Sequence, residues 1–146
     1  MRRQCCVFLV LLFLYGLMNT ASAQVVGSSG EQESGFYLEQ NYPNPFNPET
    51  KIPFVLYEDL FADGTPVVVS VRIFNVLQQY IATPTALNHP RGEAVPVTDL
   101  EYASPGRFET YWDGRDQAGR HVASGVYFVQ LVVDGRSDVR KMFVAK

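Results

Sequence analysis

The fold class is decided by the stretch Val126-Tyr127-Phe128-Val129-Gln130-Leu131-Val132-Val133-Asp134-Gly135-Arg136, which continues to Ala145. Val126 to Val133 is an apolar run that only Gln130 interrupts. Asp134-Gly135 is a two-residue combination typical of a tight hairpin turn, because both residues accept a positive φ. The stretch therefore predicts two antiparallel strands that end the chain.

Upstream of this hairpin, other segments alternate apolar and polar residues with the period of a β-strand. They are Ile52–Tyr57, Val67–Phe74 and Phe108–Trp112. No segment after residue 24 keeps helical spacing over ten residues, so we expect no helix longer than two turns. The pattern predicts an all-β protein, an antiparallel β-sandwich of about seven strands. Its expected core is Ile52, Phe54, Leu56, Val69, Val71, Ile73, Trp112, Tyr127, Val129 and Leu131.

Two details refine this prediction. Pro53 lacks a backbone donor, which indicates that its strand lies at the edge of a sheet or that Pro53 lies near the start of the strand. The segment from Ile81 to Ser104 has no steady period, and only Ala94–Val97 within it is a candidate strand. A loop of this length is unusual unless it has a function or contains a short extra strand.

The first 23 residues have the features of a secretory signal peptide. Arg2 and Arg3 precede an apolar run from Cys5 to Met18, and Ala21-Ser22-Ala23 is a small-x-small cleavage site around Ala21 and Ala23. The run is shorter than the roughly 18 residues that a membrane-spanning helix needs. We therefore expect export through the Sec pathway to the periplasm and a mature chain without cysteine.

Charge and composition exclude other classes. The 146 residues carry 12 Lys and Arg against 15 Asp and Glu, and loss of the signal peptide removes two cations, leaving a net charge of −5. An acidic chain has no concentrated basic face for nucleic acid. Residues 24–37 are predicted to be a flexible linker, because Gly27 to Gly35 contains no apolar residue. Residues 38–146 form the expected domain.

Catalytic chemistry has little support in the sequence. His89 and His121 have no neighbouring cysteine or zinc-ligand spacing, and no Gly-x-Ser-x-Gly motif is present. We expect two solvated surface histidines, no enzymatic activity and no cofactor.

Asp113-Gly114-Arg115-Asp116-Gln117-Ala118-Gly119 has two interpretations. Its two carboxylates can contribute oxygen ligands to calcium, which would indicate a calcium-stabilised adhesive module. Alternatively, Asp113 and Asp116 accept hydrogen bonds from the N–H groups of the turn while Gly114 and Gly119 take positive φ. We favour the second interpretation, with Trp112 in the core and no bound metal.

The segment Asn41-Tyr42-Pro43-Asn44-Pro45-Phe46-Asn47-Pro48 predicts a stiff strap at the entrance to the sandwich. Its three prolines fix φ and restrict the preceding residues. The asparagines Asn41, Asn44 and Asn47 can satisfy nearby backbone groups through their side chains. We expect the aromatic residues Tyr42 and Phe46 to anchor the strap against the sandwich.

These motifs together resemble the type A C-terminal sorting domains of the type IX secretion system, which are similar to the immunoglobulin-like domain of the flagellar hook-capping protein. The resemblance runs from Leu38 to Lys146 in four ordered blocks. The blocks are Leu38–Pro48, Val71–Leu77, Trp112–Asp116 with Gly119, and Val122–Phe128. The matching motif Arg140-Lys141-Met142 follows the fourth block near the end of the chain. Ser124, Gly125 and Tyr127 are among the positions of this chain that match the motifs of the family. Where family members usually have glycine this chain has Gln78, so we expect a strained or reshaped turn there.

The resemblance implies a fold, a partner and a destination. It implies an immunoglobulin-like sandwich that an outer-membrane type IX translocon recognises, so that the protein reaches the cell surface or medium. It also implies a sortase-like peptidase that removes such domains. The resemblance further implies that Lys141 and Met142 are displayed on the surface for the translocon. Alternatively, the cations Arg140, Lys141 and Lys146 are edge-strand charges that discourage aggregation. In the family a large cargo precedes the domain, whereas here only residues 24–37 do. A stand-alone sorting domain, a truncated gene product and a self-sufficient structural or adhesive module are the remaining interpretations.

Overall fold

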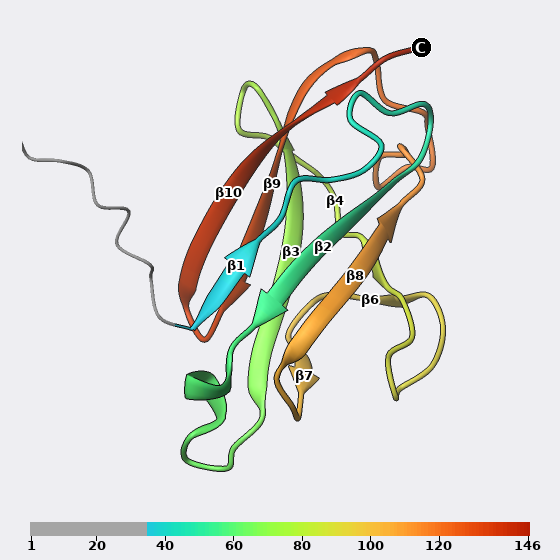
Figure 1. The fold of residues 1–146 in the computed structure, drawn as a ribbon. Helices are drawn as coiled ribbons and strands as arrows, with labels where there is room; N and C mark the ends of the chain where they lie inside the picture. Colours follow the sequence, from blue (N-terminus) through green and yellow to red (C-terminus); the bar gives the residue numbers. More distant parts are fainter. Residues whose placement is uncertain (1–34) are drawn as a thin grey trace, which may run out of the picture. The chain divides into compact units, whose positions relative to one another are not determined.

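The structure is a computed structural model that describes residues 35–146. The expected signal peptide and cleavage site, and the linker up to residue 34, lie outside the described residues. Within the described part, the chain forms two antiparallel β-sheets that enclose one hydrophobic core (Figure 1). No helix in this part is long and apolar enough to cross a membrane.

The first sheet has the order β1 (Phe36–Leu38), β2 (Thr50–Leu56), β8 (Gly106–Trp112), β5 (Thr85–Ala86) and β6 (Val95–Pro96). The second has the order β10 (Arg136–Val144), β9 (Gly125–Val133), β3 (Val67–Asn75) and β4 (Tyr80–Ala82), and β7 (Leu100–Tyr102) also pairs with β3. One 3-10 helix, η1 (Glu58–Phe61), follows β2. The prediction of an antiparallel β-sandwich is confirmed, with ten strands where about seven were expected. The first strand starts at Phe36, two residues before the expected domain boundary.

The C-terminal hairpin forms as predicted. Its register runs from Arg136 opposite Val133 to Val144 opposite Gly125. Asp134 and Gly135 both have positive φ, 46° and 83°, as a two-residue turn of this twist requires. The Asp134 carboxylate also accepts a hydrogen bond from the N–H of Val68 at 2.9 Å, which ties the turn to the start of β3.

The core contains every residue that alternation predicted. All ten expected core side chains are buried, and Ile52, Phe54, Val69, Val71, Ile73, Val129 and Leu131 are fully inaccessible. Further large side chains are buried that were not among these ten, and the fully buried ones include Leu38, Phe46, Leu100 and Met142. They lie in short strands, in the strap, or on a strand that also carries charges.

The position of Pro53 corrects one expectation. Its strand β2 has neighbours on both sides, since it pairs with β1 and β8. The Pro53 carbonyl accepts a hydrogen bond from the N–H of Glu39, directly after β1 ends. In a strand, the N–H and the carbonyl of one residue point to the same side. The N–H that Pro53 lacks would therefore point toward the segment that follows β1, where the pairing between β1 and β2 has already ended.

The segment from Ile81 to Ser104 is more ordered than its sequence indicates. It contains most of β4 and all of β5, β6 and β7, whereas only Ala94–Val97 was a candidate strand. The candidate strand Ala94–Val97 contains β6. Val97 is fully buried; its N–H donates to the Pro84 carbonyl, and its carbonyl accepts from the N–H of Val71. Strands of two or three residues are too short to show a period.

The turn between β3 and β4 contains the expected strain. Gln78 has φ 60°, in the left-handed region that glycine favours. The Asn75 side-chain oxygen accepts hydrogen bonds from the N–H groups of Leu77 and Gln79 at 2.9 and 3.0 Å. These bonds hold the turn in a conformation that its sequence does not favour.

We expect Trp112→Ala to lower the free energy of unfolding by about 3–5 kcal/mol, since it removes a large aromatic side chain and leaves a cavity. Trp112 is only 3% exposed. Denaturant unfolding followed by circular dichroism measures the loss. Tyr57→Ala is the control, because Tyr57 is 39% exposed. Equal losses in the two variants would contradict the assignment of Trp112 to the core.

Candidate functional site

A part of each of the four predicted motif blocks lies at one end of the sandwich: the strap, the end of β3, the turn after β8 and the start of β9 (Figure 1). At this end β2 begins, β8 and β3 end, and β9 begins. The strap (residues 41–48) joins β1 to β2 and passes the end of β10, close to the C-terminus. The site is therefore built from segments separated by up to about a hundred residues.

Phe46 is the main anchor of the strap, as predicted. Its side chain is 1% exposed, and its ring centroid lies 5.5 Å from that of Trp112. Trp112 in turn packs at 5.9 Å against the ring of Tyr127 on β9. One aromatic cluster thus joins the strap to a strand of each sheet.

The backbone of Phe46 behaves like an extra strand beside β10. Its N–H donates to the Phe143 carbonyl, and its carbonyl accepts from the N–H of Ala145, both at 3.0 Å. Phe46 and Val144 form a parallel bridge. Exposed strand edges invite pairing with other chains, and the strap covers this end of the β10 edge.

Two of the three asparagines satisfy polar groups, as predicted. Asn41 is 2% exposed, and its amide donates to the Pro43 carbonyl at 3.1 Å and to the Thr50 hydroxyl at 3.0 Å. The side-chain oxygen of Asn44 accepts from the N–H of Phe143 at 3.0 Å. Asn47 is exposed.

Tyr42 is not an anchor, and that prediction is wrong. Its side chain is 43% exposed and lies outside the core. The hydroxyl donates a hydrogen bond to the Glu109 carboxylate on β8. This bond raises the pKa of Tyr42 and, with the neighbouring cations Arg107 and Lys51, lowers the pKa of Glu109.

The 113–119 turn has the bonding that the structural interpretation predicts. Asp113 accepts from the N–H of Arg115 at 3.0 Å, and one Asp116 oxygen accepts from the N–H groups of Ala118 and Arg120 at 2.9 and 3.0 Å. Gly114 and Gly119 have φ of 71° and 77°.

Neither carboxylate of this turn is free for a cation. The second oxygen of Asp113 lies 3.6 Å from the Arg115 guanidinium, and that of Asp116 lies 2.8 Å from the Arg120 guanidinium. In the part of the chain that the structure describes, no three His, Cys, Asp or Glu side chains gather as a metal site. The turn therefore offers no observation that favours the calcium-stabilised adhesin.

Gly114 couples this turn to the strap. A Cβ atom at Gly114 would lie 2.2 Å from the Pro48 carbonyl oxygen, far inside contact distance. Only glycine permits this approach, because it lacks a Cβ and accepts positive φ. The strap and the turn, which lie 65 residues apart in the sequence, form one packed unit.

Arg140, Lys141 and Met142 point to three different places. Arg140 donates from Nε to the Leu38 carbonyl at 2.8 Å, across to the other sheet. Lys141 is exposed, and its ammonium lies 5.3 Å from the Phe143 ring centroid. Met142 is fully buried, so the expectation that it is displayed together with Lys141 is wrong.

The remaining motif residues fix the start of β9. The Ser124 hydroxyl accepts from the N–H of Lys146 at 3.1 Å, which ties down the end of the chain. The Tyr127 hydroxyl donates to the Ala123 carbonyl at 3.0 Å. Gly125 begins β9 with φ 150°.

Of the two histidines, His121 is exposed as expected. His89 is only partly exposed: its ring packs at 5.0 Å on Tyr102, and Nε2 lies 3.0 Å from the Glu101 carbonyl. The two histidines belong to different loops.

Two of the solved structures that are similar to this chain come from Porphyromonas gingivalis. Dimeric latent PorU is 18% identical with a TM-score of 0.49, over 75% of this chain and 9% of PorU. PorZ, an essential surface component of the type IX secretion system, is 22% identical with a TM-score of 0.43, over 83% of this chain and 13% of PorZ. The chain thus spans about a tenth of either protein. No protein-family model and no curated protein sequence matches it.

Sequence reasoning missed the contacts that join β1 to β10. The Leu38 N–H donates to the Asp138 carboxylate at 3.3 Å, and the Gln40 amide donates to the Lys141 carbonyl at 3.0 Å. These residues lie about 100 positions apart, so no local pattern connects them. A signal in the sequence was the spacing of Asp138 and Arg140, which places two charged side chains on the same face of the strand.

Gly114→Ala should destabilise the domain more than Gly119→Ala. Both positions have positive φ, which costs alanine about 1–2 kcal/mol. Only Gly114 also faces the Pro48 carbonyl, since no atom lies within 4 Å of a Cβ at Gly119. Denaturant unfolding of both variants measures the difference. Equal destabilisation would show that the strap does not press on the turn.

The Asp116 carboxylate should contribute stability that depends on pH. Hydrogen bonds from the backbone, first that of Arg120, and the Arg120 guanidinium hold its pKa below the usual value of 3.8. A lowered pKa adds stability above the unfolded-state pKa, and this stability disappears as the pH falls through the folded-state value. We expect Asp116→Ala to lower the Tm at pH 7 and to have a smaller effect near pH 2.5. A Tm difference that is independent of pH would contradict this expectation.

Proposed function

We propose that the β-sandwich of residues 36–146 is a C-terminal sorting signal that the outer-membrane type IX translocon recognises. The protein then reaches the cell surface or the medium after export through the Sec pathway, and a sortase-like peptidase processes it there. The domain acts through recognition and carries out no catalysis. The motif blocks that resemble type A sorting domains support this assignment.

The observation that carries the proposal is the position of those blocks in the fold. The strap, the 113–119 turn and the end of β10 touch one another through Phe46, Gly114 and Phe143. A signal displayed on a folded domain requires such a fixed arrangement, because recognition is lost when its parts move apart.

The test is a fusion of residues 34–146 behind a Sec-exported reporter enzyme in a host with a working type IX system. We expect the reporter on the cell surface or in the medium. In a matched strain whose translocon is inactivated, the same fusion should stay in the periplasm. This control leaves the folded domain unchanged and isolates the sorting step.

A second fusion that lacks residues 138–146 should also stay in the periplasm. This deletion removes Met142 from the core, so circular dichroism of the purified fusion must accompany it. If the intact fusion is folded but remains periplasmic in the working host, the sorting assignment is wrong, and a structural or adhesive role at the surface becomes the better account.

A further inference from the structure

The outward face of the second sheet is unusually apolar for a solvent-facing surface. Strand partners in register share a face of a sheet, so Val139, Gln130 and Arg72 form one outward row. Lys141, Phe128 and Phe74 form the next. Val139 is 50% exposed, and both phenylalanines are partly exposed. We call the outward side of β10, β9 and β3, with the turn at residues 75–78, the apolar face.

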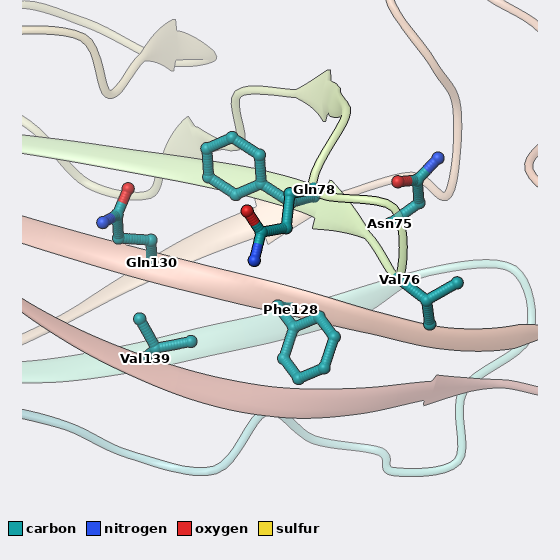
Figure 2. A pocket seen from close by; sticks show the side chains of 7 residues that line it. Asn75, Val76, Gln78, Phe128, Gln130 and Val139 are labelled. Atoms are coloured by element: carbon teal, nitrogen blue, oxygen red, sulfur yellow. The ribbon is translucent and has the colours of Figure 1, made fainter.

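This face is also hollowed. A groove of about 490 Å³ runs over it, with apolar walls from Phe74, Val76, Phe128 and Val139. Val76 and its neighbour Leu77, at the edge of the groove, are 62% and 74% exposed. Figure 2 shows the side chains of Gln130, Phe128 and Val139 around the same open space. Contiguous apolar surface of this kind marks an interaction site in a soluble domain.

Near the groove the charges on this face have one sign, whereas toward the start of β3 two carboxylates adjoin it: Asp99 accepts a hydrogen bond from the Ser70 hydroxyl at 3.0 Å, and Glu101 is the register partner of Val68. None of the outward positions of β10, β9 and β3 holds Asp or Glu. Arg72 and Lys141 are exposed there, and neither forms an ion pair with a described carboxylate. The chain as a whole carries more carboxylates than cations. The cationic face therefore complements an acidic partner.

We propose that the apolar face binds an apolar, acidic polypeptide segment of the outer-membrane secretion machinery. This inference rests on the proposed sorting function. The apolar side chains of the segment fill the groove, and its carboxylates pair with Lys141 and Arg72. The amides of Gln78 and Gln130 also line the groove and offer donors and acceptors to a peptide backbone, whereas the Asn75 amide is engaged within its own turn.

Two other occupants fit less well. A second copy of the chain would place Lys141 and Arg72 of both copies together without carboxylates, and like charges across an interface oppose association. The interior of a membrane offers no hydrogen-bond partners to the amides of Gln78 and Gln130, so burying them there is unfavourable. A hollow also suits a protruding side chain better than a flat lipid surface.

The test is photo-crosslinking of the full chain in cells with a working type IX system. A photoreactive phenylalanine analogue replaces Val139, which is 50% exposed, or Tyr57, a control outside the face that is 39% exposed. We expect adducts with an outer-membrane component of the secretion machinery from position 139 and none from position 57, and an adduct with an unrelated protein would contradict the proposal. Mass spectrometry of the crosslinked peptide should identify an apolar segment that contains Asp or Glu.

A charge-reversed pair tests the electrostatic part. Lys141→Glu should lower the adduct yield at least roughly fivefold, because it turns an attraction into a repulsion. Lys146→Glu, an exposed lysine outside the face, should leave the yield unchanged. The Tm of both variants is measured to confirm that they fold.

Each other outcome overturns the inference. An adduct with a second copy makes the face a dimer interface, an adduct with lipid makes it a membrane contact, and a basic segment contradicts the charge argument. An absence of adducts shows that the face binds nothing.

Export of the chain is measured in the same cells. Export without adducts refutes this inference alone, and an acidic adduct without export refutes only the sorting function.

Discussion

The insertion of Phe46 into the core is the interaction on which the rest of the structure depends. Its ring packs against Trp112, while its own backbone pairs with the edge of β10. One residue therefore closes the core at this end and covers a strand edge that would otherwise be open. The neighbouring Asn44 adds a side-chain bond to the N–H of Phe143. The strap thus fixes the last strand of the chain from the side that β9 does not reach.

The same principle closes the sandwich along β1. Asp138 and Arg140 on β10 bind the N–H and the carbonyl of Leu38, so side chains join the edges of the two sheets. The C-terminal strand is consequently held by β9, by β1 and by the strap. A strand held on both sides presents its outward residues in a fixed geometry, and a partner that binds it does not have to order it first. This rigidity is consistent with the proposed role as a signal on a folded domain.

The sequence allowed the long strands to be predicted because burial alternates along them, and a period of two is visible over seven or nine residues. Strands such as β5 and β7 could not be predicted, since two or three residues show no period and their pairing comes from distant segments. The strap shows the same limit at the site. Tyr42 and Phe46 are equivalent as sequence signals, yet only Phe46 meets the core. The difference depends on where Trp112 and β10 lie, which the local sequence does not contain.

Arg140, Lys141 and Met142 show why a motif that is continuous in sequence is not a continuous surface. The three side chains reach the opposite sheet, the solvent and the core, respectively. Substitution of Met142 acts through stability, whereas substitution of Lys141 acts on the surface and leaves the core intact. A partner that recognises this end of the chain must therefore read residues brought together from several strands. The apolar face is such a surface, because Lys141 meets Phe128 of β9 and Phe74 of β3 there in one row.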